Sequence, residues 1–137
     1  MFLNGSIRWF EAITEPDDYL VFDIAVYDNS IYMTGYTSSF ISPRLLPKDV
    51  FVASFASDGS LKWFKTIEGA GYEGVMDIAT YDDSLFTAGS TDSFDAGGND
   101  AFIASLFDSD GALRWLKTVG GAEMEYASCI AVYGDSI

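Results

Sequence analysis

An internal repeat is the feature of this 137-residue sequence that most limits what it can fold into. The stretch Asn99–Gly121 contains an apolar run, the turn-forming sequence Asp-Ser-Asp-Gly, and a second apolar run that carries a tryptophan. The stretch Asp49–Gly69 has the same organisation, and Leu3–Phe10 repeats its second half. Two strand-like runs joined by a glycine-containing turn are typical of a β-hairpin. The sequence therefore predicts a chain built from repeated β-hairpins.

The spacing between landmarks is nearly constant from copy to copy. Aligning the copies pairs three tryptophans, Trp9, Trp63 and Trp115, which are 54 and 52 residues apart. An isoleucine followed by alanine lies 15 residues after each tryptophan, at Ile24, Ile78 and Ile130. Length differences fall between the apolar runs, where loops are expected. The repeat period is therefore about 53 residues.

Each period holds four strand-like runs and no helix-like pattern. In the complete middle repeat the predicted strands are Val75–Tyr81, Ser84–Ser90, Phe102–Phe107 and Leu113–Val119. Residues that favour turns separate them. Several runs are apolar at consecutive positions, which indicates sheets covered on both faces. We expect an all-β chain of four-stranded antiparallel meanders, packed face to face as the blades of a β-propeller.

The repeats assign the whole chain, 1–137, to a single repeat region. The predicted divisions are a partial blade 1–22, a blade 23–72, a blade 77–121 and the start of a next blade 128–137. Because a propeller ring needs at least about four blades, these repeats are incomplete as a single chain. Unpaired strand edges favour association. Two interpretations stay open: a fragment of a larger propeller, which is favoured, or self-assembly of several chains.

The pattern Asp-Ala-Phe-Ile-Ala, then Asp-Gly-x-Leu-x-Trp, Gly-Gly and Ile-Ala-Val resembles the bacterial β-propeller repeat known as the SBBP repeat. The third copy carries it at Asp100–Ala104, Gly111, Trp115, Gly120, Gly121 and Ile130–Val132, and the second at Asp49–Ala53, Gly59, Trp63, Ile78 and Ala79. The second copy departs from the pattern at Glu68, where the first glycine of Gly-Gly is expected. The resemblance implies a non-catalytic binding or spacing module of exported or cell-surface bacterial proteins. The sequence begins without the basic and apolar segments of a signal peptide.

The spacing Gly-x-x-x-Trp is similar, more weakly, to the tryptophan-docking motif of quinoprotein propellers. In that family the tryptophan of one blade packs against the glycine-containing turn of its neighbour. The resemblance implies a structural blade-packing role for Trp9, Trp63, Trp115, Gly59 and Gly111. It also places the tryptophan hairpin in the outer strands of a blade and the Ile-Ala-Val run in the innermost strand.

Composition limits the classes of partner and of chemistry. The chain has 21 acidic and 7 basic residues, a formal charge of −14, which disfavours binding to nucleic acid or to an anionic membrane. No apolar run is long enough to insert into a membrane. Histidine is absent, which excludes histidine-dependent catalysis and histidine metal sites.

Charged residues near the tryptophans and in the turns have two interpretations each. Five basic residues flank the tryptophans, and pairing with carboxylates such as Asp23 and Asp77 is favoured over an anion site; they are Arg8, Lys62, Lys65, Arg114 and Lys117. The turn Asp108–Gly111 resembles half of a calcium loop but lacks its closing glutamate, so a tight turn is favoured and no cofactor is expected. Cys129 stands where the other copies have these two aspartates, and we expect a buried, inert thiol there.

The sequence thus predicts a non-catalytic structural or protein-binding segment, not an enzyme. Its expected partner is itself, through blade edges, or the remainder of a propeller. The alternative is a part of an enzyme propeller, quinoprotein-like or glycosidase-like, whose active site lies in missing blades. Ligand specificity is expected where the copies differ, in two loops that contain Ser39, Arg44, Asp92 and Asp95.

Overall fold

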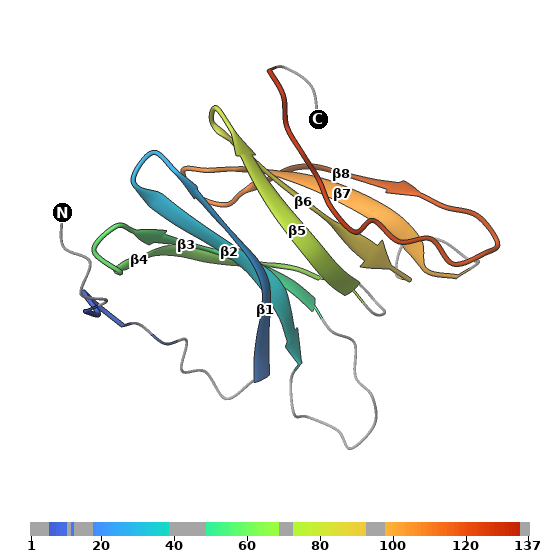
Figure 1. Cartoon of the computed structure of the whole chain (residues 1–137). Coiled ribbons are helices and arrows are strands. Elements are labelled where there is room, and N and C mark those ends of the chain that lie inside the picture. The colour runs from blue at the N-terminus through green and yellow to red at the C-terminus, as the bar shows by residue number, and fades with distance from the viewer. Residues whose placement is uncertain are drawn as a thin grey trace.

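The part of the chain that the structure describes folds into two four-stranded antiparallel sheets (Figure 1). The computed structural model describes residues 6–10, 12, 18–38, 49–68, 73–92 and 98–134. The N-terminal sheet contains β1 (Asp18–Tyr27), β2 (Ser30–Ser38), β3 (Asp49–Ala56) and β4 (Leu61–Ile67), in that order. The C-terminal sheet contains β5 (Glu73–Tyr81), β6 (Ser84–Thr91), β7 (Asp100–Phe107) and β8 (Leu113–Val119), also in that order. The prediction of an all-β chain of four-stranded antiparallel meanders is confirmed.

The turns explain why aspartate and glycine recur between the strands. In the β1–β2 turn, Asp28 and Asn29 have φ angles of 44° and 60°, which short polar side chains tolerate better than most. In the β3–β4 turn Gly59 has φ 90°, and the Asp58 carboxylate accepts the backbone N–H of Ser60 at 3.0 Å. Gly111 has φ 73° in the β7–β8 turn, where Asp110 likewise accepts the N–H two residues ahead. These aspartates therefore close hairpin turns.

The first strand of each sheet has a β-bulge at the same repeat position. The register of β1 shifts between Val21 and Asp23, and that of β5 shifts between Val75 and Asp77. A bulge adds one residue to a strand and redirects the side chain that follows it. In both sheets that side chain is an aspartate.

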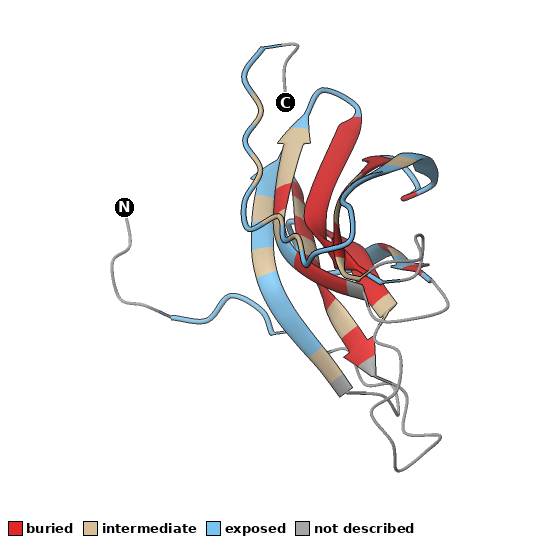
Figure 2. Cartoon of the chain, turned by 90° about the vertical axis from the view of Figure 1, so that its right-hand side faces the viewer, coloured by how far each residue is buried: buried red, intermediate tan, exposed pale blue. Residues whose placement is uncertain are grey.

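The core lies between the two sheets and on the outer side of the N-terminal sheet. Alternate residues of β3 point to opposite faces, so Val50 and Val52 face the C-terminal sheet whereas Phe51 and Ala53 belong to a second cluster. This two-sided burial accounts for the continuous apolar run. Figure 2 shows that burial is concentrated in the middle strands, whereas β1 is largely exposed.

Both sheets contribute to the cluster between them. Its buried members are Tyr32, Val50, Val52, Trp63 and Ile67 from the N-terminal sheet and Val75, Ile78, Leu85, Phe102, Ala104 and Leu106 from the C-terminal sheet. The two faces that meet are not equivalent in the repeat. The face of the N-terminal sheet that is buried in this contact corresponds to the face of the C-terminal sheet that points away from it.

Candidate functional site

Trp63 fastens the two sheets together at the turn between β7 and β8. Its indole N–H donates a hydrogen bond to the backbone carbonyl of Asp108 at 2.9 Å. A Cβ added at Gly111 would lie 2.6 Å from a ring carbon of Trp63, so the indole occupies the space that a side chain would need. Only 9% of Trp63 is exposed. The glycine is therefore required both for its φ angle and for close contact with the indole.

Trp9 makes the same contact with the β3–β4 turn. Its indole N–H donates to the carbonyl of Ser57 at 2.9 Å, and a Cβ added at Gly59 would lie 2.7 Å from its ring. Yet 41% of Trp9 remains exposed, because it belongs to a segment that does not pair with any described strand.

Trp115 occupies the equivalent position on β8 and contacts no such turn. It is 36% exposed and packs beside Phe86 of its own sheet, with ring centroids 6.2 Å apart. Its indole N–H makes no hydrogen bond to any of the described residues. Two of the three equivalent tryptophans therefore lie on a glycine turn, and the third does not.

A second contact between repeats starts from the first strand of each sheet. The Asp23 carboxylate accepts the backbone N–H of Ile78 at 2.9 Å, and the Asp77 carboxylate accepts that of Ile130 at 2.8 Å. The bulges aim both aspartates at the next repeat. The sequence did not predict that these aspartates join the repeats, because a bulge leaves no clear pattern of apolar and polar residues. The only signal in the sequence was that the aspartates stand at equivalent positions of the repeat.

The two carboxyl groups also interact with each other, since both accept the Ile78 N–H. Burial raises the pKa of Asp77, and its hydrogen bond with Asp23 and the charge of Asp23 raise it further, against the N–H donors of Ile130 and Ile78. Burial also acts to raise the pKa of Asp23, but hydrogen bonds from Asp77 and from the backbone outweigh burial and lower it. Asp77 is therefore the member of the pair that holds a proton more readily.

Asp77→Asn should stabilise the protein at neutral pH, by up to about 1 kcal/mol because the pair is partly exposed and screened. The amide can donate to Asp23, as the protonated carboxyl does, and removes a negative charge. A group with a raised pKa contributes stability that is greatest below its ordinary pKa and is lost as the pH rises through the raised value. The gain should therefore appear as the pH rises from about 3.8 through the raised pKa of Asp77. Urea titrations across this range measure it, and a variant that is less stable at neutral pH would contradict the assignment.

The basic residues near the tryptophans bind partners other than those predicted. Lys62 and Arg114 are the extra residues of bulges in β4 and β8, and each reaches the first serine of the second strand of its sheet. Lys62 donates to Ser30 at 2.9 Å, and Arg114 donates to Ser84 and pairs with Asp83 at 3.1 Å. The predicted pairing with a carboxylate is therefore seen for Arg114, but with Asp83 and not with Asp23 or Asp77, which accept backbone N–H groups instead.

The first glycine of the Gly-Gly pair makes room for an aspartate. Asp100 is 1% exposed, and a Cβ added at Gly120 would overlap its carboxylate. One oxygen of Asp100 is buried and has no hydrogen-bond partner among the described residues. The contact between Asp100 and Gly120 therefore packs the start of β7 against the end of β8.

The remaining candidate residues are dispersed or undescribed. Asp92 is exposed at the end of β6, whereas Ser39, Arg44 and Asp95 lie outside the described residues. Cys129 is exposed, so the expected buried thiol is wrong. Its segment is not part of a strand and lies beside the C-terminal sheet, where the neighbouring Ile130 donates to Asp77.

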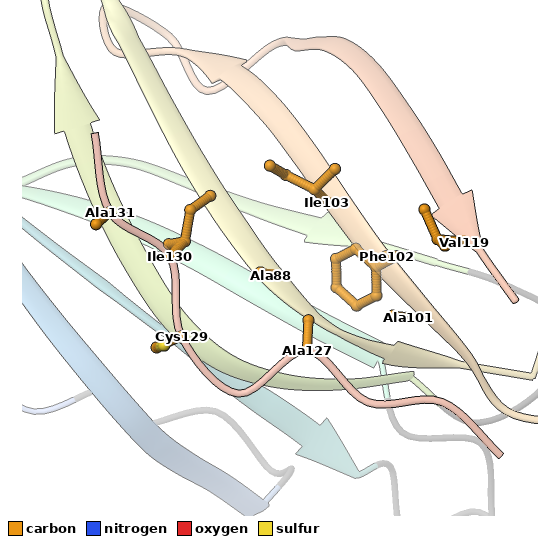
Figure 3. A pocket seen from close by; sticks show the side chains of 9 residues that line it. All are labelled: Ala88, Ala101, Phe102, Ile103, Val119, Ala127, Cys129, Ile130 and Ala131. Carbon is orange, nitrogen blue, oxygen red and sulfur yellow. The ribbon is translucent and has the colours of Figure 1, made fainter. Parts of the chain in front are cut away.

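One face of the C-terminal sheet is open, and we define this open face by Phe86, Ala101, Ile103, Trp115 and Val119. The segment 127–131 crosses one side of it, where Ala127 donates to the carbonyl of Gly89 at 3.3 Å. Between this segment and the sheet lies an apolar pocket of about 330 Å³. Figure 3 shows Ile130 from the segment and Ile103, Phe102 and Val119 from the sheet around it.

A scan against protein-family models and a search of curated proteins find no match to this chain. Within the described ranges, no three acidic or cysteine side chains gather closely enough to hold a metal ion. The same ranges contain no helix of the length and apolarity needed to cross a membrane.

Proposed function

We propose that this chain is a non-catalytic β-propeller repeat segment whose function is to bind another protein β-sheet on its open face. The observation that carries the proposal is a difference between equivalent positions of the two sheets. Ile67 of β4 is 7% exposed beneath the C-terminal sheet, whereas its equivalent Val119 of β8 is 72% exposed. The equivalent tryptophans differ in the same direction, since Trp63 is 9% exposed and Trp115 is 36% exposed. The face that is covered by another sheet in the N-terminal sheet is therefore exposed in the C-terminal sheet.

The chemistry of the open face suits a protein partner. Its side chains are aliphatic and aromatic, and burying them would stabilise a complex by roughly 25 cal/mol per Å² of apolar area. The indole N–H of Trp115, which has no hydrogen-bond partner in the described part of the chain, supplies a directional donor for a backbone carbonyl. Exposed apolar patches bordered by polar residues are typical of interaction sites. The contact between the two sheets uses the same two elements, an indole and an apolar face.

The resemblance to the SBBP repeat supports the propeller arrangement, the non-catalytic role and a location outside a bacterial cell or on its surface. The stacked sheets, the tryptophan contacts with glycine turns and the aspartate contacts between innermost strands are what a blade-to-blade arrangement requires. Under this proposal the pocket beside the segment 127–131 is the unfilled part of a blade interface.

The apolar dye ANS tests whether the open face is a receptive apolar surface. We expect ANS to bind the folded protein, and Ile103→Lys to abolish most of that binding while circular dichroism stays native. Ser109→Lys, at an exposed turn position, adds the same charge and should leave ANS binding intact. Because ANS is an anion, loss of binding on adding a lysine cannot be electrostatic repulsion. A folded protein that does not bind ANS, or that binds it equally after Ile103→Lys, would refute the proposal.

A further inference from the structure

We propose that the sheet which covers the open face belongs to a second copy of this chain, whose β3–β4 turn receives Trp115 in exchange for its own Trp9. This inference rests on the proposed function and names the partner. The copies would associate head to tail, with the C-terminal sheet of one copy against the outer face of the N-terminal sheet of the other.

The turn around Gly59 is built to receive a tryptophan. It matches the turn around Gly111 in its left-handed glycine, with φ 90° against 73°, and in the aspartate that accepts the following N–H. Both turns already bind an indole N–H through a backbone carbonyl at 2.9 Å. A backbone acceptor does not depend on the source of the indole. Trp115 of another copy can therefore make the hydrogen bond that Trp9 makes now.

Trp9 is a weak occupant of that turn. It stays 41% exposed where Trp63 in the equivalent contact is 9% exposed, and its neighbours Ile7 and Phe10 are more exposed still. Trp115 would arrive with a complete four-stranded sheet behind it. Since apolar burial scales with the area covered, the incoming sheet has the larger stabilising contribution.

The outer face of the N-terminal sheet offers the apolar surface that such a sheet needs. Ile24 of β1 is 57% exposed, whereas its equivalent Ile78 of β5 is 5% exposed against the N-terminal sheet. The proposed interface therefore continues the one between the two sheets, and β1 of the second copy displaces the segment 127–131, in which Ile130 donates to Asp77 as Ile78 donates to Asp23. It buries the exposed member of both pairs, Val119 on one copy and Ile24 on the other.

Charge complementarity supports the same pairing. The aliphatic part of Lys65 lies against the Gly111 turn, where an added Cβ would be 2.7 Å from its Cγ. Lys117 is the equivalent residue of β8, so it would lie against the Gly59 turn beside the exposed carboxylate of Asp58. The net charge of −14 opposes association, so added salt should strengthen it. Because the two surfaces differ, the contact is heterologous and continues into a ring or a filament.

Sedimentation of the full chain over a range of concentrations tests the proposal. We expect concentration-dependent association that Trp115→Ala weakens on the order of tenfold or more, as removal of a central aromatic anchor does. Trp9→Ala should strengthen association, because it removes the competitor for the turn. Met124→Ala removes another exposed apolar side chain, beyond β8, and should change nothing. Circular dichroism checks that each variant is folded, and Lys117→Glu replaces Trp115→Ala if that variant is not.

Zero-length cross-linking identifies the surfaces in contact. In a mixture of isotopically labelled and unlabelled protein, a carbodiimide should join Lys117 of one copy to Asp58 of another. A monomer at every concentration, a cross-link confined to one copy, or association that Trp9→Ala weakens would each overturn the proposal. A monomer that still binds ANS would overturn only the second copy as partner and leave the proposed function standing. A folded monomer that does not bind ANS would refute the proposed function itself.

Discussion

Replacing Trp63 by alanine should lower the free energy of unfolding by about 3–5 kcal/mol, the usual cost of removing a buried aromatic side chain. The indole belongs to the cluster between the sheets, and its N–H satisfies the carbonyl of Asp108. The substitution leaves a cavity over the Gly111 turn and an unpaired carbonyl at the same place. Both effects loosen the contact between the two sheets, so the loss is measured as a lower midpoint in urea.

Trp115→Ala is the matched control for this experiment, since it removes the same side chain from the equivalent strand. Trp115 is more exposed and its indole makes no hydrogen bond within the described residues, so we expect a loss of about 1 kcal/mol or less. Both titrations are run at low protein concentration to avoid any contribution from association. Equal losses in the two variants would show that the tryptophan contact with the turn does not stabilise the stack.

Gly35→Ala should destabilise the chain by about 3 kcal/mol or more, at the upper end of the costs of overpacking. A Cβ at this position would overlap the backbone carbonyl of Leu20 in β1 and lie 2.9 Å from the ring of Phe51. Backbone atoms of a paired strand cannot move aside without breaking the ladder. Gly89 has the same relation to Gly74 of β5, so Gly89→Ala should behave alike. Thermal unfolding followed by circular dichroism measures both changes.

Gly121→Ala provides the control, because a Cβ at that position would meet no atom within 4 Å. Its unfolding midpoint should stay within the small range typical of surface substitutions. If Gly35→Ala proved as mild as Gly121→Ala, the close approach of β1 and β2 beside the bulge would be wrong.

The repeat made most of the fold predictable from the sequence. Constant spacing located the strands, and Asp-Gly pairs located the turns, because turn chemistry depends only on neighbouring residues. The predicted strand Leu113–Val119 has the observed bounds, and β5 and β7 begin two residues before the predicted starts, at Glu73 and Asp100. Local sequence patterns were therefore sufficient to predict the secondary structure and the order of strands within each sheet.

The contacts between sheets were less predictable, because they depend on bulges. One extra residue in a strand turned Asp23 towards the N–H of Ile78 and turned Lys62 towards Ser30. Neither direction follows from strand alternation. The exposure of Cys129 also could not be read from its neighbours in the sequence, since it depends on what lies over its segment. The same limit applies to the open face, whose residues look as apolar as those of the buried face.

The contacts of Trp63 and Asp23 with the neighbouring repeat share a property with consequences for how such chains diversify. Each anchoring side chain binds a backbone group of the neighbour, a carbonyl for Trp63 and an N–H for Asp23. A joint that recognises backbone atoms places few demands on the side chains opposite it. These two contacts therefore tolerate changes in the loops of a repeat, provided that its turn keeps the glycine and its facing strands keep their apolar side chains.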